Sequence, residues 1–263
     1  MNLKPKKSLG QNFLFDNDIL SKIVDVGNVS SKDVILEIGP GTGSLTEKIL
    51  QKKPKKIYVV EKDKDLVKEL DKKFGNKVEI INKDILECYN QFHFNKPLKV
   101  FGNLPYNISS KILTSFIKID DLNKFFEIFI FIFQKEVAER IVAYENLKEY
   151  GRLSVLVSWK MKTKKIIDIS PDKFFPQPKV WSSLVALYPR NNIHKLKKSK
   201  NLEHITNIFF NQRRKMIKKP MKLLFKNYEE IAKRLDIKLN LRPQNISKDK
   251  FIEICKFYEN LIQ

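Results

Sequence analysis

The sequence predicts an α/β fold in which a mainly parallel sheet is followed by a helical region. Residues 34–38 form a short apolar run, which is typical of a buried central strand. Gly39, Gly41 and Gly43 follow it, and residues 44–50 have the apolar spacing of a helix. Glycine tolerates positive φ and lets the backbone come close to a ligand. A strand, a glycine turn and a helix in this order open a nucleotide-type pocket.

The spacing of these glycines departs from the dinucleotide fingerprint. That fingerprint requires G-x-G-x-x-G, whereas here the third glycine comes one residue early and Ser44 follows it. The difference favours a ligand that has no pyrophosphate to place at the helix N-terminus. A tight turn with a purely structural role is the alternative.

Two acidic residues follow the next predicted strands. Residues 57–60 end at Glu61, and residues 78–81 run into Asp84. A carboxylate at the first position can accept hydrogen bonds from both hydroxyls of a ribose, and one at the second suits an adenine amine. Either acid alone is more typical of a solvated strand end. Their recurrence at the carboxyl ends of successive strands, where open α/β sheets bind ligands, favours a binding site.

The fourth predicted strand, residues 98–101, leads into an element that indicates the chemistry. Its residues are Gly102, Asn103, Leu104, Pro105, Tyr106 and Asn107. An ordinary turn would use similar residue types. Combined with the glycine turn and both acids in the same order, however, the element resembles the S-adenosylmethionine-dependent amino-methyltransferases that act on nucleic-acid bases. This resemblance implies S-adenosylmethionine as the cofactor.

The chemistry of an adenine amine explains such residues. The exocyclic nitrogen is a poor nucleophile because its lone pair is delocalised into the ring. The side-chain oxygen of Asn103 and the backbone carbonyl of Leu104 or Pro105 would accept its two N–H bonds and favour a tetrahedral nitrogen. Tyr106 would stack on the base and hold it in line. The reaction requires no metal.

Several separated blocks extend the resemblance over nearly the whole chain. The sequence is similar to the ribosomal RNA adenine dimethyltransferase family, and within it to the bacterial small-subunit type. The matching blocks are residues 6–14, 133–138, 150–155, 174–182 and 209–215. The family implies a Rossmann-like, seven-stranded class I methyltransferase sheet with a small C-terminal all-helical domain. It also implies a cofactor-binding set that comprises Asn12, Leu14, Gly39, Gly41, Glu61, Asp84 and Asn103.

One block departs from the family pattern. Residues 174–182 resemble F-x-P-P-P-K-V-D-S, with Gln177 in place of a proline and Trp181 in place of the aspartate. Phe174 retains the aromatic that would hold the target base against Tyr106. The alternative is a phenylalanine of the core. The substitutions bear on RNA contacts and not on the reaction.

The charge of the chain agrees with a nucleic-acid substrate. Its 51 Lys and Arg outnumber 30 Asp and Glu, which gives a formal net charge of +21. Such a field concentrates polyanions, although a base-composition bias of a genome can also enrich lysine. The basic residues inside the family blocks are the better phosphate-binding candidates. They are Lys6, Lys7, Arg213, Arg214 and Lys215.

A composition break near residues 189–192 divides the chain. Residues 1–189 are expected to form the catalytic domain that binds S-adenosylmethionine, and residues 190–263 a helical domain that docks on RNA or the ribosome. In the first, residues 125–133, 153–157 and 184–188 are further predicted strands. In the second, residues 202–216, 228–235 and 248–261 are predicted helices, and Ser247 is a candidate N-cap.

The remaining features argue against several classes of protein. No apolar stretch is long enough for a membrane span, and the N-terminus lacks a signal-type apolar region. Cys88 and Cys255 do not make a disulfide framework, and the histidines fit no ligand spacing, so no metal is expected. We expect a cytoplasmic monomer.

The resemblance thus implies an enzyme that dimethylates two adjacent adenines near the 3′ end of 16S rRNA in a partly assembled small ribosomal subunit. Two alternatives remain open. One is the antibiotic-resistance type that methylates 23S rRNA. The other is a non-catalytic assembly or transcription factor on the same fold.

Overall fold

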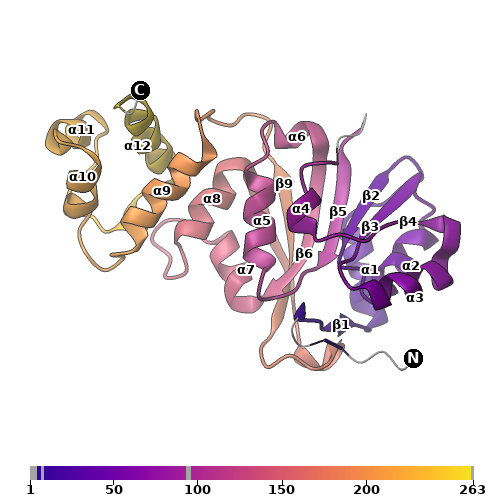
Figure 1. Ribbon diagram of the computed structural model, residues 1–263. Coiled ribbons are helices and arrows are strands. Elements are labelled where there is room, and N and C mark those ends of the chain that lie inside the picture. The colour runs from indigo at the N-terminus through magenta and orange to yellow at the C-terminus, as the bar shows by residue number, and fades with distance from the viewer. Residues whose placement is uncertain (1–4, 7–8, 93–95, 262–263) are drawn as a thin grey trace. The chain divides into compact units, whose positions relative to one another are not determined.

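The computed structural model describes residues 5–6, 9–92 and 96–261 (Figure 1). These residues form two compact units. The first lies within residues 1–138 and 162–189, and the second lies within residues 139–161 and 190–263. The sequence assigned residues 139–161 to the first domain. They belong to the second unit because helix α8, residues Arg152–Lys160, packs against two of its helices, α9 and α12.

A seven-stranded sheet with the order β4-β3-β2-β5-β6-β9-β7 forms the centre of the first unit. Neighbouring strands from β4 to β6 are parallel, and β9 pairs with β6 antiparallel. The predicted seven-stranded fold is therefore confirmed. The strands are β2 (Val34–Ile38), β3 (Lys56–Val60), β4 (Glu79–Ile81), β5 (Leu98–Asn103), β6 (Phe126–Gln134), β7 (Met161–Ile169) and β9 (Ser182–Pro189).

The central strands are almost continuously apolar because both of their faces are covered. Strand β6 reads FEIFIFIFQ, and six of its residues in succession, from Ile128 to Phe133, are buried. The helices of this unit are α1 (Asn17–Val26), α2 (Ser44–Gln51), α3 (Lys64–Phe74), α4 (Ile85–Cys88), α5 (Ser109–Ile117) and α6 (Leu122–Phe125). Helix α7 (Lys135–Val142) runs from the first unit into the second.

A second, two-stranded ladder lies in the first unit. Strand β1 (Phe13–Leu14) pairs antiparallel with β8 (Phe174–Phe175), so that Phe13 faces Phe175 and Leu14 faces Phe174. The pairing joins two of the family blocks, which are far apart in the sequence.

One prediction about the sheet was wrong, and one strand was missed. Residues 153–157 were expected to be a strand but belong to helix α8. A run that is buried on all sides carries no periodicity that separates a strand from a helix. Conversely, no strand was expected at residues 161–169, where β7 occupies one edge of the sheet. Its Lys162, Lys164 and Lys165 are polar and lie largely toward solvent, so the segment has the character of an edge strand and not of a core strand.

The second unit is helical, as predicted. Its further helices are α9 (Ser199–Phe210), α10 (Lys218–Leu224), α11 (Tyr228–Arg234) and α12 (Lys248–Leu261). Helix α9 ends at Phe210 and does not continue to residue 216, because polar residues follow and form a turn. The Ser247 hydroxyl accepts a hydrogen bond from Lys250 N at 3.3 Å, as expected of an N-cap. Short 3₁₀ turns lie at Gly75–Lys77, Pro171–Lys173 and Pro243–Asn245. No helix of the described residues is long and apolar enough to cross a membrane.

Candidate active site

A cavity of about 330 Å³ lies at the carboxyl ends of the parallel strands in the first unit. This is the edge at which open α/β sheets bind their ligands. All residues that the sequence assigned to cofactor binding line it, namely Asn12, Leu14, Gly39, Gly41, Glu61, Asp84 and Asn103. Leu104, Pro105 and Tyr106 line the same cavity. The structure thus gathers segments that lie far apart in the sequence.

The glycine turn leaves no room for a side chain at Gly41 or Gly43. Gly39, Gly41 and Gly43 have φ of 65°, 60° and 79°. A Cβ atom on Gly41 would lie 2.8 Å from the ring of Phe13, and one on Gly43 would lie 2.5 Å from the ring of Phe74. Only glycine satisfies both the positive φ and the close contacts. The turn is therefore fixed between two aromatic rings.

Glu61, at the end of β3, is buried and tied to this turn. Its Oε2 accepts a hydrogen bond from Gly41 N at 3.3 Å, and its Oε1 accepts one from Asp63 N at 2.8 Å. Burial raises the pKa of the Glu61 carboxyl, while the two backbone N–H groups act in the opposite direction. The carboxyl is thus held at the cavity wall in one orientation.

Asp84 caps the short helix α4 and forms an ion pair. Its carboxylate accepts a hydrogen bond from Leu86 N at 2.9 Å and contacts Lys62 Nζ at 2.9 Å. Partial burial acts to raise its pKa, but the hydrogen bonds from Lys62 and Leu86 outweigh this, and the pKa lies below its ordinary value. Asp84 is therefore ionised at neutral pH.

Glu37 is a cavity residue that the sequence reasoning missed. It lies within β2, is 1% exposed, and its Oε2 accepts a hydrogen bond from Thr46 Oγ1 at 2.6 Å. Burial raises its pKa to about 7, against the effect of Thr46 and together with the repulsion of Glu61. The signal in the sequence is a charged residue inside an otherwise apolar strand.

Asn103, the last residue of β5, lines the cavity and has an unused acceptor. Asn103 Nδ2 donates a hydrogen bond to the backbone carbonyl of Asn12 at 2.6 Å. This bond fixes the orientation of the amide, and no described residue donates to Asn103 Oδ1. The Tyr106 hydroxyl lies 2.5 Å from the Ser182 hydroxyl, and burial raises the pKa of Tyr106. The terminal polar atoms of both side chains are therefore held by hydrogen bonds.

Phe174 lies in the hydrophobic core instead of at the cavity. It is 2% exposed, pairs with Leu14 across the ladder, and does not line the cavity. In this conformation neither face of its ring is open to a base. A stacking role for Phe174 remains a prediction that requires β8 to rearrange.

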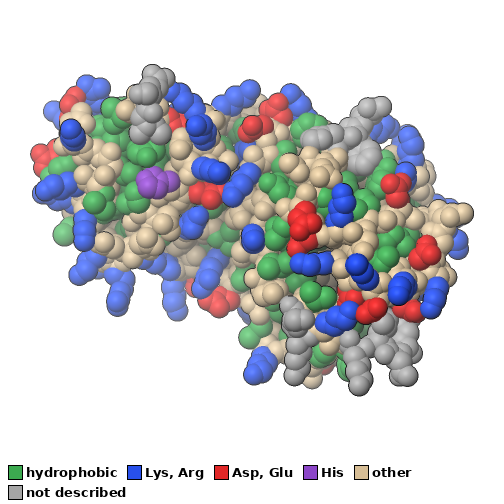
Figure 2. All heavy atoms as spheres, viewed as in Figure 1, with side chains coloured by type: hydrophobic (Ala, Val, Ile, Leu, Met, Phe, Trp, Pro, Cys, Tyr) green, Lys and Arg blue, Asp and Glu red, His purple; other side chains and the backbone are tan. Residues whose placement is uncertain are grey.

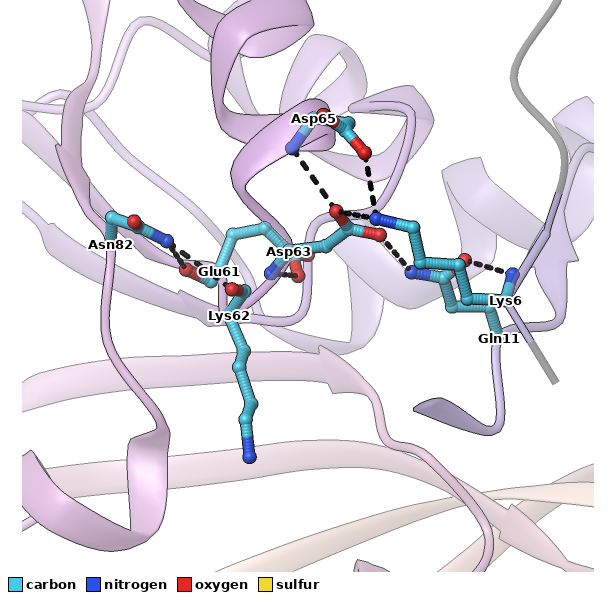
Figure 3. A network of polar contacts seen from close by, with 7 residues as sticks. All are labelled: Lys6, Gln11, Glu61, Lys62, Asp63, Asp65 and Asn82. Carbon is cyan, nitrogen blue, oxygen red and sulfur yellow. Dashed lines mark hydrogen bonds and ion pairs between the residues drawn. The ribbon is translucent and has the colours of Figure 1, made fainter. Parts of the chain in front are cut away.

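The N-terminal segment is fastened beside the cavity by a network of polar contacts (Figure 3). Lys6 Nζ lies 2.6 Å from Asp63 Oδ1 and 2.7 Å from Asp65 Oδ2. Gln11 Nε2 donates to Asp63 Oδ2 at 2.9 Å, and Gln11 Oε1 accepts from Lys6 N at 2.8 Å. Lys6, a predicted phosphate contact, is thus paired within the chain. Lys7 lies outside the described residues.

The other predicted RNA contacts lie in the second unit, in the turn that follows α9. Arg213 Nη2 donates a hydrogen bond to the Lys148 carbonyl, while Arg214 and Lys215 are exposed. The described part of the chain shows no cluster of side chains that could hold a metal ion. Figure 2 shows Lys and Arg side chains spread over the visible face, so charge alone does not mark one RNA path.

Comparisons with known proteins identify the family of this chain. The family described as "Ribosomal RNA adenine dimethylase" matches residues 2–260. A "Ribosomal RNA small subunit methyltransferase A" of Pelagibacter ubique is 52% identical over 261 residues, which cover 99% of both chains. Another of that name, of Francisella tularensis subsp. novicida, is 40% identical and covers 97% of each chain.

Solved structures have the same fold. A dimethyladenosine transferase from Plasmodium falciparum superposes with a TM-score of 0.77 at 26% identity, covering 92% of this chain and 95% of that one. The 23S rRNA methyltransferase ErmE superposes with a TM-score of 0.69 at 20% identity, covering 95% and 100% of the two chains, which shows the fold alone. Because the family match spans nearly the whole sequence, this chain belongs to the ribosomal RNA adenine dimethylase family.

Proposed function

We propose that this chain transfers methyl groups from S-adenosylmethionine to the exocyclic amines of two adjacent adenines near the 3′ end of 16S rRNA. The observation that carries the proposal is the position of Asn103, which lines the same cavity as Glu61 and Asp84 and whose Oδ1 accepts from no described residue. The family membership supports an adenine target. The names of the relatives support the small-subunit type over the 23S type.

The residues of the cavity fit the cofactor. Its volume of about 330 Å³ falls in the range of roughly 300 to 1,000 Å³ that is usual for small-molecule sites. The turn from Gly39 to Gly43 would let the amino-acid part of the cofactor approach the backbone, Glu61 would accept the ribose hydroxyls, and Asp84 would accept the adenine amine. Asn12 and Leu14 would close the site from the N-terminal segment. When bound, the cofactor supplies an electrophilic methyl group on a sulfonium.

The chain's own contribution to catalysis would be position and fixed dipoles. Asn103 Oδ1 and the carbonyl of Leu104 or Pro105 would accept the two N–H bonds of the adenine amine and turn its lone pair toward the methyl group. Tyr106, anchored through Ser182, would stack on the base. Each methyl group gained displaces one amine proton. The amide of Asn103 needs no reorientation, because Asn12 already holds it.

The second unit would dock the substrate. The exposed Arg214 and Lys215, with Arg213 beside them, would contact phosphates of the rRNA in a partly assembled small subunit. We expect the enzyme to act as a monomer in the cytoplasm, where ribosomal subunits assemble.

The decisive experiment compares rRNA from cells with and without this gene. Mass spectrometry of 16S rRNA fragments should find dimethylated adenines only when the gene is present, and the Asn103→Ala variant should not restore them. Dimethylation that persists without the gene, or that occurs in 23S rRNA, would overturn the proposal. Equal restoration by wild type and Asn103→Ala would overturn the role given to Asn103.

A further inference from the structure

An exposed aromatic surface lies on the ladder of β1 and β8 and the loop that follows it. Phe15 is 55% exposed, Phe175 60%, Val180 45% and Trp181 50%. The β1–β8 pairing brings Phe175 beside the segment that contains Phe15, and Val180 and Trp181 follow in the loop between β8 and β9. Folded proteins seldom gather large apolar groups on their surface without a partner for them. We call the surface formed by these four residues the aromatic surface.

The pairing register explains why this surface is continuous with the cavity. Successive residues of a strand point to opposite faces. Leu14 and Phe174 point into the core, so Phe13 and its cross-strand partner Phe175 share the other face. Phe15, two positions after Phe13, follows on that face, and its N–H donates to the Lys173 carbonyl at 3.2 Å. Because Phe13 lines the cavity, the aromatic surface begins at the cavity wall.

Trp181 is held close to the residue that would stack on the target base. The next residue, Ser182, contacts the Tyr106 hydroxyl at 2.5 Å. The Trp181 carbonyl accepts a hydrogen bond from Lys135 N at 2.9 Å, and Lys135 Nζ lies 5.9 Å from the centre of the Trp181 ring. Lys135 is in turn paired with Asp168 at 3.0 Å. The indole is therefore supported by the first turn of α7 while half of its area remains open.

The charges near these rings favour a nucleic acid over an apolar protein partner. Lys173 is paired with Asp16 at 2.7 Å, but Lys179, exposed on the same loop, forms no ion pair with any described residue. The whole chain carries a net charge of +21. Aromatic rings interspersed with cations are what unpaired bases on a phosphate backbone require.

We propose that Phe15, Phe175 and Trp181 form a stacking surface for the unpaired RNA bases that flank the target adenine. The proposal deepens the proposed function and rests on it, since an RNA substrate is what brings unpaired bases to this edge. It also gives a role to Trp181, which stands where the family pattern has an aspartate. The surface would hold the RNA strand as it enters the cavity.

The two tryptophans of the chain make the proposal directly measurable. Trp159 is 4% exposed and donates its indole N–H to the His194 carbonyl, so Trp159→Phe leaves Trp181 as the only tryptophan. Titration of this variant with single-stranded oligoadenylate should quench the Trp181 fluorescence. Inorganic polyphosphate of matched charge, which has no bases, should not. Equal quenching by both polyanions, or none by oligoadenylate, would overturn the stacking role.

Affinity measurements on substituted proteins test whether the residues of this surface contribute to RNA binding more than an exposed aromatic residue elsewhere does. Phe175→Ala and Trp181→Ala should each weaken oligoadenylate binding by about tenfold, which is the usual effect of losing one base stack. Polyphosphate binding should not change. The matched control is Tyr188→Ala, since Tyr188 is 40% exposed at the other end of β9. A similar loss in the control, or no loss in either variant, would contradict the assignment.

A methylation assay tests the proposed function separately from the aromatic surface. If wild type methylates 16S rRNA and both alanine variants bind oligoadenylate as tightly as wild type does, the aromatic surface is wrong and the proposed function stands. If oligoadenylate quenches Trp181 but no rRNA is methylated, the surface binds unpaired bases, but the proposed function and the flanking of a target adenine both fail. Capture of a protein partner by the surface in place of RNA would also refute it.

Discussion

The Nζ atom of Lys6 lies 2.6 Å from Oδ1 of Asp63, although 57 positions separate the two residues. Asp63 N also donates a hydrogen bond to Glu61, whose other carboxyl oxygen accepts from Gly41. The N-terminal segment is therefore linked through Asp63 to the acid and the turn of the cavity. Residues 9–14 of that segment line the cavity themselves.

Replacing Lys6 should loosen this segment. In Lys6→Met we expect weaker binding of S-adenosylmethionine, by less than the loss caused by removing Glu61, because the ion pairs are partly open to solvent. The difference from wild type should shrink as salt rises. Isothermal calorimetry at two salt concentrations measures both effects. The control is Lys52→Met, which breaks the ion pair with Asp25 outside the cavity and should change nothing.

Removing the Glu61 carboxyl should have a larger effect. Glu61→Ala is expected to cost about 1.5 to 3 kcal/mol of cofactor binding, as is usual for hydrogen bonds to a charged group. Calorimetry gives the affinity, and a thermal melt establishes that the variant is folded. Equal affinity in wild type and a folded variant would remove Glu61 from the cofactor site.

Asn103 is expected to act on the reaction and not on RNA binding. Asn103→Ala should leave RNA affinity intact and slow methyl transfer by roughly a hundredfold or more, as the loss of one fixed dipole commonly does. Single-turnover methylation at saturating enzyme measures the step. An unchanged rate in a folded variant would show that another group orients the amine.

Glu37 should make the stability of the folded state depend on pH. Its pKa is raised from 4.5 to about 7, so between these values the folded chain binds more protons than the unfolded chain. Wild type should therefore lose stability as the pH rises through this window, by at most about 3 kcal/mol. Glu37→Gln keeps the acceptor for Thr46 and should lose this slope. Melting temperatures of both proteins from about pH 4.5 to about pH 8 decide the matter, and parallel curves would contradict it.

The turn after α9 should dominate phosphate binding in the second unit. Replacing Arg213 and Arg214 with Gln should lower affinity for immature small subunits and flatten its salt dependence, by about 0.9 in logarithmic slope for each phosphate that is no longer neutralised. The control is the pair Lys197 and Lys198. Their backbone N–H groups bind the Glu259 carboxylate, so substitution of the two side chains by Gln leaves these hydrogen bonds in place. Filter binding across a salt titration compares the two double variants. A larger loss from the lysine pair would place the docking surface elsewhere.

Local sequence predicted much of the fold and of the cavity. Residues 34–43 carry a strand and a glycine turn whose positive φ values only glycine adopts easily, so the pattern and the geometry have the same cause. Glu61 and Asp84 could be assigned to one edge because the carboxyl ends of parallel strands meet there.

What could not be predicted depends on contacts between distant segments. Whether Phe174 or Phe175 is exposed follows from the register of β8 on β1, and a shift by one residue exchanges them. The pairing of Lys6 with Asp63 and the raised pKa of Glu37 arise only once the chain is folded. Helix α8 was mistaken for a strand because its burial on all sides hides its period.

The lysines of β7 have a consequence that is unrelated to RNA. An edge strand exposes backbone groups that can pair with the edge of another copy and start aggregation. Strand β7 carries Lys162, Lys164 and Lys165 at this edge, while β4 at the opposite edge is only three residues long. Repulsion between the lysines opposes pairing of β7 with another strand, and the short length of β4 limits pairing at the opposite edge. The sheet is thereby protected from growing into a larger one, even at the protein concentrations that prevail inside a cell.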